Sequence, residues 1–428
     1  MDKNKLLIKS GRVIEPATGG DDVADILVED GKIKKIAKDI QTQSQTIIDA
    51  KGKIVLPGLV DMHVHLRQPG REDKETILTG TKAALAGGIT SILAMPNTTP
   101  VVDSKETVNL VKEIIDREAC ANVYISAAIT KKQASGELTD IDSLKKNGVI
   151  AITDDGSSVD SDELMLAVFK KAKKRGVLVI CHSEDKSLSK DGVINAGFIA
   201  TKLGLKGISK ESEYKRIQRD IDLAKKAGSA VHIAHVSCKE SVEAIEAAKK
   251  KGIKVTVETA PHYFSLTESS VQGYDTNMKM NPPLRTEEDK KAIKKALSCG
   301  IIDVIASDHA PHTENEKDIE FDRAAFGVIG LETELAVSIT ELVDKGVLSW
   351  LDLAKKMSYN PAKILGLGAG TLKKGSIADI VIIDADKEWV PKRESFVSKS
   401  KNSCFLGKKL KGVVEYTIKD GKVVYSTS

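Results

Sequence analysis

The sequence predicts an α/β protein in which a (β/α)₈ barrel carries a small β-sandwich domain formed by both ends of the chain. Three observations lead to this fold class. The middle of the chain alternates short β-branched runs with helical segments, which is the order of βα units. The strand-like runs there are almost continuously apolar, as expected of strands with both faces buried. The two ends instead contain short strands joined by turns.

The barrel is expected between residues 57 and 366. Its eight candidate strands finish within residues 61–65, 91–96, 123–127, 149–155, 177–182, 231–235, 254–258 and 303–308. Eight strands fit a closed barrel of about 250 residues or more. Segments between them, such as 161–175 and 239–251, carry apolar residues at helical spacing, and Gly176 and Gly252 follow them as helix stops.

The two ends of the chain resemble each other locally. Residues 28–33 and 418–423 each contain an Asp-Gly pair suited to a tight hairpin. We expect one β domain built from residues 1–56 and 367–428, with the barrel inserted between its halves. A true internal repeat is the alternative, but two six-residue matches are too short to support one.

Composition places the chain among ordinary globular proteins. Hydrophobic residues make up 41% and charged residues 29%, which argues against disorder, fibres and membrane spans. The net charge of +4 comes from interspersed charges, so no basic region points to nucleic acid. The amino terminus lacks a long apolar run, and we expect a cytoplasmic protein. Five scattered cysteines without a C-x-x-C pair indicate reduced packing residues.

The most specific local signal is the motif of residues 61–67, Asp-Met-His-Val-His-Leu-Arg, at the end of the first barrel strand. Residues two apart in a strand point to the same face, so His63 and His65 can reach one metal ion. Two core histidines are the alternative explanation of an isolated H-x-H pair.

Further candidate ligands end other predicted strands, and these ends meet at the face of a barrel where catalytic residues lie. They are Asp154, Asp155, His182, His235 and Asp308. Parity does not decide between Asp154 and Asp155, because both follow the last apolar residue of their strand. On the strand of residues 231–235, His235 shares a face with the apolar residues. His235 is therefore the expected ligand, and His232 is expected to pack between strand and helix.

Imidazoles and carboxylates from separate strands suit zinc or a similar divalent ion. An ion held this way lowers the pKa of a bound water to about 7 and polarises a carbonyl, which is the chemistry of a hydrolase. A closed structural zinc site would be rich in cysteine, and none of the clustered positions is a cysteine.

A second motif follows the eighth strand as Ala-Ser-Asp-His-Ala-Pro-His at residues 306–312, with Lys317 further on. Asp308 is placed to serve as a metal ligand and a general base, because a carboxylate beside an activated water can take its proton and pass it on. A plain helix cap is the alternative role. His312 is expected on the loop above the site.

Together the two motifs resemble the signatures of the dihydroorotases of the amidohydrolase superfamily, specifically the longer bacterial type. D-x-H-x-H-x-R and A-S-D-x-A-P-H with a later lysine are both matched without a gap. Further blocks in family order are residues 95–98, 153–156, 181–184, 235–237, 258–262, 279–283 and 375–379. The likeness covers nearly the whole chain.

By position, the resemblance implies metal ligation by His63, His65, Asp155, His182, His235 and Asp308. It implies substrate contacts from His65, Arg67, Asn97, Asn281 and His312, with the backbone of Phe326 and Gly327 closing over the ring. Arg67 suits this role because a guanidinium can hold a carboxylate by two charge-assisted hydrogen bonds. We assign His262 a structural role.

The implied reaction is the reversible hydrolysis of (S)-dihydroorotate to N-carbamoyl-L-aspartate in pyrimidine (UMP) biosynthesis. Asp308 would move a proton from the attacking water to the departing amide nitrogen, with Zn²⁺ as the ion. The resemblance further suggests a homodimer and an association with aspartate transcarbamoylase as candidate assemblies.

One departure from related enzymes concerns the fourth strand. Hydantoinases, allantoinases and the other dihydroorotase type bridge two zinc ions there with a carbamylated lysine, whereas residues 153–156 contain no lysine. Asp155 is the natural substitute bridge, so one or two zinc ions are expected.

Two alternatives remain at this point. Another cyclic amidohydrolase, such as a hydantoinase or allantoinase, is disfavoured by Arg67, Asn97 and Asp155. A non-catalytic subunit that scaffolds aspartate transcarbamoylase is disfavoured because such relatives lose metal histidines. The charged segment 313–323 is expected to be a mobile loop near the site, and its role as a lid is a further hypothesis, with a plain surface excursion as the alternative.

Overall fold

The structure, a computed structural model, describes residues 5–42 and 46–427. Its centre is a parallel sheet whose eight strands are neighbours in chain order, and a parallel bridge between Val64 and His309 closes it into a barrel. The strands are β6 (Leu59–Val64), β7 (Ile89–Ala94), β8 (Asn122–Ala127), β9 (Ala151–Ile152), β10 (Leu178–Cys181), β13 (Val231–Ile233), β14 (Val255–Thr259) and β15 (Val304–Ile305). The predicted barrel is confirmed.

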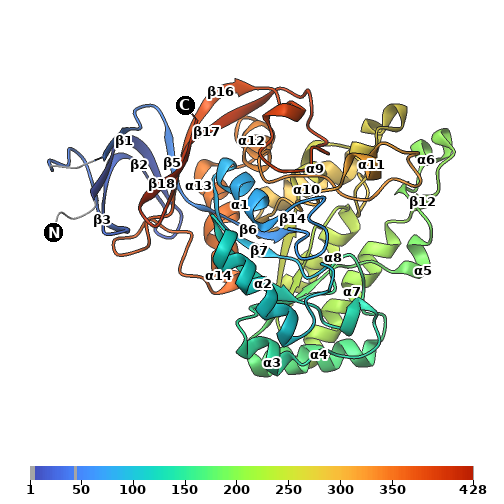
Figure 1. The fold of residues 1–428 in the computed structure, drawn as a ribbon. Coiled ribbons are helices and arrows are strands. Elements are labelled where there is room, and N and C mark those ends of the chain that lie inside the picture. Colours follow the sequence, from blue (N-terminus) through green and yellow to red (C-terminus); the bar gives the residue numbers. More distant parts are fainter. Residues whose placement is uncertain (1–4, 43–45, 428) are drawn as a thin grey trace.

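Helices connect the strands and surround the barrel (Figure 1). They are α1 (Ile77–Ala86), α2 (Lys105–Glu118), α3 (Ile141–Lys146), α4 (Asp162–Arg175), α7 (Glu211–Ala227), α8 (Lys239–Lys250), α10 (Glu287–Ser298), α12 (Glu334–Ser338), α13 (Trp350–Ala354) and α14 (Asn360–Leu365). Ser161 caps the start of α4, and Gly176 ends it in the left-handed conformation with a φ of 61°. The predicted helices 161–175 and 239–251 therefore match α4 and α8 to within one residue.

Shorter elements complete the chain. Those near the carboxyl ends of the barrel strands are α5 (Lys186–Ser189), β11 (Ile194–Asn195), α6 (Phe198–Leu203), β12 (Gly207–Ile208), α9 (Pro261–Ser265) and α11 (Glu314–Lys317). Short 3₁₀ segments are η1 (Lys131–Gln133), η2 (Glu268–Ser270), η3 (Gln272–Tyr274), η4 (Thr276–Met278) and η7 (Arg393–Ser395), and π-helical segments are η5 (Ile339–Val343), which continues α12, and η6 (Lys355–Tyr359), which joins α13 to α14. No helix in the described part of the chain combines the length and apolar character needed to cross a lipid bilayer.

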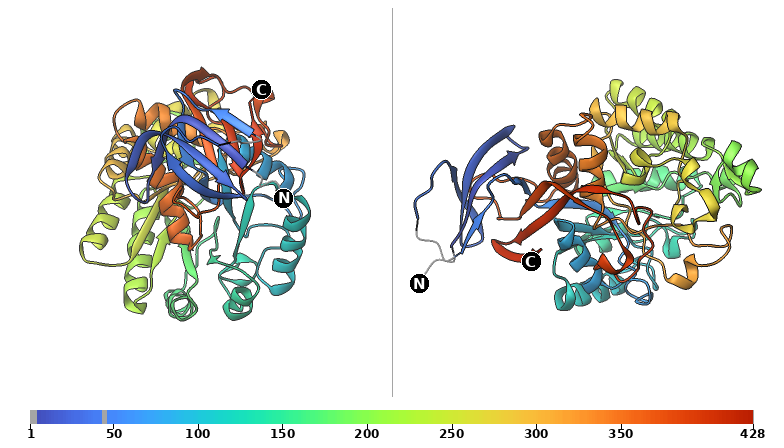
Figure 2. Two further views of the ribbon diagram at one scale, coloured as in Figure 1. Left: turned by 90° about the vertical axis from the view of Figure 1, so that its left-hand side faces the viewer. Right: turned by 90° about the horizontal axis from the view of Figure 1, so that it is seen from above.

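The two ends of the chain form a second sheet beside the barrel (Figures 1 and 2). Its strands are β1 (Lys5–Glu15), β2 (Gly20–Glu29), β3 (Lys32–Ala37), β4 (Thr46–Asp49), β5 (Ile54–Pro57), β16 (Ile380–Trp389), β17 (Leu410–Lys419) and β18 (Lys422–Ser426). Strand β5 joins the halves, because it pairs with β1 on one side and with β16 on the other. Residues from both ends of the chain share one apolar core, which confirms that the termini form a separate β structure.

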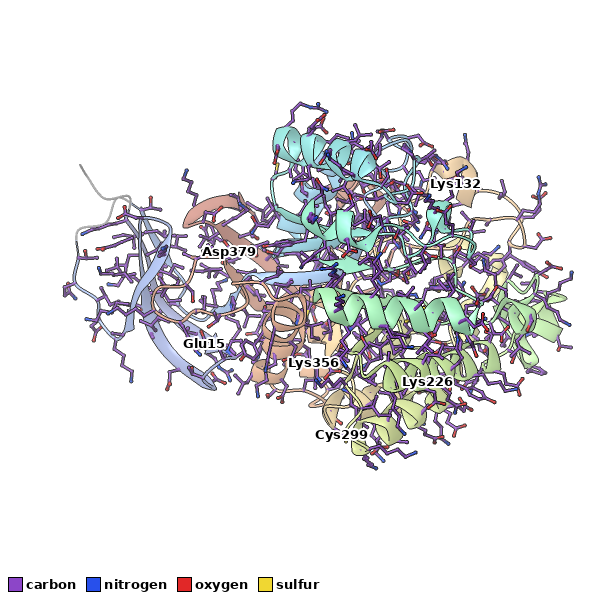
Figure 3. The ribbon with its side chains drawn as sticks, turned by 90° about the horizontal axis from the view of Figure 1, so that it is seen from below. Glu15, Lys132, Lys226, Cys299, Lys356 and Asp379 are labelled. Atoms are coloured by element: carbon purple, nitrogen blue, oxygen red, sulfur yellow. The ribbon has the colours of Figure 1, made fainter. Side chains whose placement is uncertain are left out.

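The limits 1–56 and 367–428 of this domain stay a prediction, and residues 1–4, 43–45 and 428 lie outside the described residues. Segment 390–409, between β16 and β17, leaves the sheet and packs on the barrel, since Phe405 belongs to the core between barrel strands and helices. Asp379 lies at the junction (Figure 3), where its backbone oxygen accepts a hydrogen bond from the Gly58 N–H.

The two predicted Asp-Gly turns are confirmed. Asp30 and Gly31 have φ angles of 49° and 77°, and Asp420 and Gly421 have φ angles of 51° and 74°, as a type I′ hairpin requires. The turns also touch, because a Cβ added to Gly31 would lie 2.9 Å from the Asp420 backbone oxygen. The local likeness of the two ends thus reflects two hairpins packed against each other.

The two ends of the barrel differ. At the amino end of the strands, Ala362 and Leu365 of α14 pack with Val60 and Val304 and fill the interior. Figure 1 shows α6 and α11 at the other end, away from the terminal sheet. Polar and charged side chains gather at that carboxyl-end rim.

Candidate metal centre and active site

His63 and His65 lie side by side at the end of β6, with ring centroids 5.4 Å apart. The register between β6 and β7 shifts between Asp61 and Val64, so a β-bulge lies directly at the two histidines. The Asp61 carboxylate accepts hydrogen bonds from the backbone N–H groups of His63 and Ser307, at 3.0 and 3.2 Å. It therefore ties the end of β6 to the residues that follow β15.

Asp155 lies at the centre of the histidine cluster. Its two carboxylate oxygens lie 3.3 Å from His63 Nε2, 3.4 Å from His65 Nε2, 3.6 Å from His182 Nδ1 and 3.6 Å from His235 Nε2. Burial disfavours the charged carboxylate, but the charge of His63 and the close imidazoles of His182 and His235 outweigh burial and hold the pKa of Asp155 well below its ordinary value. Asp155 is thus an ionised carboxylate that lies close to all four imidazoles, as a shared candidate ligand would.

Asp154 points elsewhere. Its carboxylate accepts hydrogen bonds from the backbone N–H groups of Ile129 and Thr130, at 2.8 and 3.1 Å, and from the Thr130 hydroxyl at 2.5 Å. These bonds hold the loop after β8. The question that strand parity left open therefore has a geometric answer, because only Asp155 of the two lies in the cluster.

His182 and His235 face each other, with Nδ1 of the first 2.8 Å from Nε2 of the second. His235 reaches the cluster because the strand ends at Ile233 and His235 has a left-handed φ of 35°. The parity argument for this strand was wrong. Ile233 packs in the core shared with the helices, whereas the fully buried His232 contacts Glu258 inside the barrel at 3.2 Å.

Asp308 completes the cluster from the chain after β15. Its Oδ1 lies 3.7 Å from His63 Nε2 and 3.6 Å from His65 Nε2. Burial raises the pKa of its carboxyl, but the nearby His65 and the charge of His63 outweigh burial and lower the pKa overall. Asp308, His235 and Arg67 all have positive φ, and such backbone strain is typical of functional sites.

The donor set fits a divalent ion. His63 Nε2 and Asp155 Oδ1 are buried without a hydrogen-bond partner, although buried polar atoms are normally paired. Two groups of ligand atoms, each within 4.8 Å of one another, share Asp155: His63, His65 and Asp155 form one, and Asp155, His182 and His235 form the other. Imidazole nitrogens and a shared carboxylate could hold one ion or two.

Arg67 and His312 lie together at the rim. Arg67 Nε donates to the Pro311 backbone oxygen at 3.1 Å, and its Nη2 lies 3.3 Å from His312 Nε2. Burial and the charges of Arg67 and Lys74 lower the pKa of His312 to about 2, so its ring is neutral. His312 Nε2 also lies 2.8 Å from the Phe326 backbone oxygen, which brings the predicted substrate residues of this loop together.

Asn97 and Asn281 lie next to the candidate metal cluster. The Asn97 Oδ1 lies 2.8 Å from His65 Nδ1, so its amide nitrogen remains available to a ligand. Asn281 Nδ2 donates to the Glu184 carboxylate at 3.2 Å, and the same oxygen lies 3.3 Å from His182 Nε2. Asn97 therefore contacts a candidate metal ligand directly, whereas Asn281 contacts Glu184, which is the partner of another candidate ligand.

The backbone of Gly327 packs closely against Ala310 and His312. It has a φ of 126°, and an added Cβ would lie 2.6 Å from Ala310 Cβ and 3.2 Å from His312 Nε2. The buried Lys317 fixes the same backbone, since its Nζ donates to Ala325 and Gly327 oxygens at 2.8 and 3.0 Å. Segment 313–323 contains the short helix α11, and its role as a lid stays a prediction.

Sequence reasoning missed two residues. Glu258, on β14, lies 2.6 Å from His63 Nδ1. It ends a predicted strand, as the chosen ligands do, but it was not selected as a site residue. Asn402, far along the chain, accepts a hydrogen bond from the His312 backbone N–H at 3.2 Å and donates to the Gly327 oxygen at 3.1 Å. The strand-end rule signals Glu258, whereas no local pattern signals Asn402.

His262 remains outside the ligand groups. Its ring packs edge-on against Tyr263 at 4.2 Å, and burial lowers its pKa to about 4. Its Nε2 is buried without a hydrogen-bond partner. The structural role expected for His262 stays a prediction.

Solved structures define the class of the protein. The chain is similar to an L-hydantoinase (dihydropyrimidinase) from Arthrobacter aurescens, with 28% identity and a TM-score of 0.89 over 98% of this chain and 96% of that one. A D-hydantoinase from a Bacillus sp. matches at 27% identity with a TM-score of 0.86, over 98% and 95%. Fold and site together define a metal-dependent amidohydrolase that acts on cyclic amides.

Sequence relatives define the family. A family model described as dihydro-orotase-like matches residues 52–241. A dihydroorotase of Elusimicrobium minutum is 51% identical over 98% of this chain and 97% of that protein, and one of Geobacter metallireducens is 52% identical over 98% and 99%. The chain belongs to the dihydroorotase family.

Proposed function

We propose that the chain catalyses the reversible hydrolysis of (S)-dihydroorotate to N-carbamoyl-L-aspartate. The observation that carries this proposal is the setting of Arg67. Its guanidinium is close enough to Asp155 and Asp308 for their charges to act on it, yet within the described part of the chain no carboxylate forms an ion pair with it. Dihydroorotate carries a carboxylate on its ring, and a guanidinium fork can bind it with two parallel hydrogen bonds.

We propose Zn²⁺ as the ion, one or two per chain, held by His63, His65, Asp155, His182, His235 and Asp308. When bound, the ion supplies an activated water and polarises the substrate carbonyl. Imidazole binds zinc through a deprotonated ring nitrogen, and such nitrogens together with the ionised Asp155 fit this role because both are common zinc ligands.

Asp308 is the proposed general base. Its lowered pKa keeps the carboxylate ionised at neutral pH, so it can accept the proton of the attacking water. The same carboxyl then donates this proton to the ring nitrogen as the amide bond breaks. Each turnover therefore returns Asp308 to its starting state.

The remaining residues bind and orient the ring. Arg67 and His312 hold the carboxylate end, and Asn97 and Asn281 offer amide donors to the other polar atoms. The backbone of Phe326 and Gly327 closes the pocket, with Gly327 N–H already used by the Lys279 oxygen at 3.0 Å. His65 would contact both ion and substrate.

Hydantoin hydrolysis is the second candidate, because the similar solved structures are hydantoinases. The experiment compares kcat/KM for dihydroorotate, for dihydrouracil, which is the same ring without the carboxylate, and for hydantoin. Two charge-assisted hydrogen bonds of at least about 1.5 kcal/mol each predict a preference for dihydroorotate of roughly 100-fold or more. Faster turnover of either ring without a carboxylate would favour the hydantoinase alternative.

A homodimer and an association with aspartate transcarbamoylase are further proposals that rest on the family resemblance. Light scattering of the purified chain tests the first, and co-elution with aspartate transcarbamoylase tests the second. Location in the cytoplasm also stays a prediction of the sequence.

A further inference from the structure

We propose that Glu258 and His232 are positioning residues of the metal centre: Glu258 orients His63, and His232 holds Glu258. Neither residue belongs to the two groups of candidate ligand atoms. The inference rests on the proposed metal ligation by His63. Glu258 and His232 would thus influence zinc affinity through His63, without contacting the ion themselves.

The first contact fixes which nitrogen of His63 faces the ligand cluster. Glu258 Oε1 lies 2.6 Å from His63 Nδ1, while His63 Nε2 points at Asp155 and Asp308, 3.3 and 3.7 Å away. An ionised carboxylate only accepts hydrogen bonds, so Nδ1 carries the proton and Nε2 presents its lone pair. A partner of this kind sets the tautomer and ring orientation of a metal-binding histidine.

The second contact holds the carboxylate itself. Glu258 Oε2 lies 3.2 Å from His232 Nε2, and His232 Nδ1 lies 2.9 Å from the Thr256 hydroxyl. With neutral rings, one assignment of protons satisfies the whole chain of contacts: Thr256 donates to His232, His232 donates to Glu258, and His63 donates to Glu258. Each oxygen of Glu258 thus has one donor.

Burial makes the pair hard to replace. Glu258 and His232 are 1% and 0% exposed, so no water can substitute for a lost donor or acceptor. The acceptors behind two other histidines are weaker: Asn97, behind His65, is neutral, and the side chain of Glu184, behind His182, is 14% exposed. Loss of Glu258 should therefore weaken zinc binding more than loss of Asn97 or of Glu184.

The experiment measures zinc affinity of the full chain by competition with a chelator. Glu258→Gln keeps the shape but places an amide N–H₂ against one of two donors, so affinity should fall about 10- to 100-fold. His232→Met should also weaken binding, whereas His232→Gln, which retains a donor, should restore it. The double variant Glu258→Gln/His232→Met should bind no more weakly than Glu258→Gln, because His232 acts through Glu258.

Glu15→Gln is the matched control, since Glu15 is a buried carboxylate of the terminal sheet (Figure 3) that accepts from the Leu372 N–H. Its zinc affinity should equal that of the wild type. Equal affinity in Glu258→Gln, or additive losses in the double variant, would overturn the proposal. Thermal unfolding of the metal-free variants separates a lost ion from a lost fold.

A measurement on the wild type covers the case in which Glu258→Gln does not fold. Nitrogen-15 spectra of the zinc-loaded chain should give a His63 ring protonated on Nδ1, and protonation on Nε2 would refute the assignment. Failure of the wild type to bind zinc would instead refute the proposed metal site. The two failures are therefore distinguishable.

Discussion

Replacement of Arg67 by lysine isolates the role of its planar fork. Nε already donates to the Pro311 oxygen and Nη2 faces His312, which leaves the outer N–H groups for a ligand carboxylate. A lysine keeps the charge but cannot form two parallel bonds. Loss of one charge-assisted hydrogen bond costs about 1.5–3 kcal/mol, so kcat/KM for dihydroorotate should fall roughly 10- to 150-fold.

The assay follows ring opening by ultraviolet absorbance for Arg67→Lys and for Arg71→Lys, a neighbouring arginine that is paired with Asp73 and Glu316 at the surface. Arg71→Lys should stay within about twofold of the wild type, as exposed ion pairs contribute little. Dihydrouracil serves as the substrate control, because it has no carboxylate to lose. An equal loss on both substrates would show that Arg67 holds the His312 loop rather than the carboxylate, and would refute the reasoning.

Three further predictions concern the base, the ion and a buried lysine. Asp308→Asn should lower kcat by about 10²- to 10⁴-fold without changing the thermal unfolding of the metal-free protein, because the proton carrier is lost; near-normal turnover would contradict its role. Chelation should abolish activity and lower the unfolding temperature, since an ion at about 100 times its Kd stabilises by about 2.7 kcal/mol; an unfolding temperature that ignores chelation would argue against the site. Burial lowers the pKa of Lys356 to about 8 from an ordinary 10.5, so the unfolded chain binds more protons between these values and wild-type stability should rise with pH across that window. Urea titrations should therefore show that Lys356→Met is more stable than the wild type at pH 7 by up to about 3 kcal/mol, less the contribution of the lost hydrogen bond to the Ile302 oxygen. This difference in unfolding free energy should shrink towards pH 10. A difference that stays constant with pH would exclude the mechanism.

The sequence predicted the elements whose signals are local and strong. Apolar β-branched runs located the eight barrel strands, and Gly176 marked a helix end because a left-handed residue was needed there. Once the barrel was recognised, the candidate ligands at its strand ends had to converge. The meeting of His63, His182 and His235 follows from that rule, whereas the choice of Asp155 over Asp154 needed the family resemblance.

The same reasoning failed where the backbone departs from regular geometry. Strand parity assumed that residues 231–235 are all extended, but the strand stops at Ile233 and His235 turns into the site with a positive φ. His232 therefore faces the barrel interior, and the contact with Glu258 could not be foreseen. Asn402 was equally hidden, since it reaches His312 from a segment 90 residues further along the chain.

The pairing of β5 with both β1 and β16 has a consequence for synthesis on the ribosome. The first strands emerge long before their last neighbours exist, so the edge that β16 later covers stays open while the whole barrel is translated. Open edges invite wrong pairing with other chains, and slow completion prolongs that exposure. A premature stop before β16 would therefore leave a nascent chain prone to aggregation, even with every proposed metal ligand already synthesised.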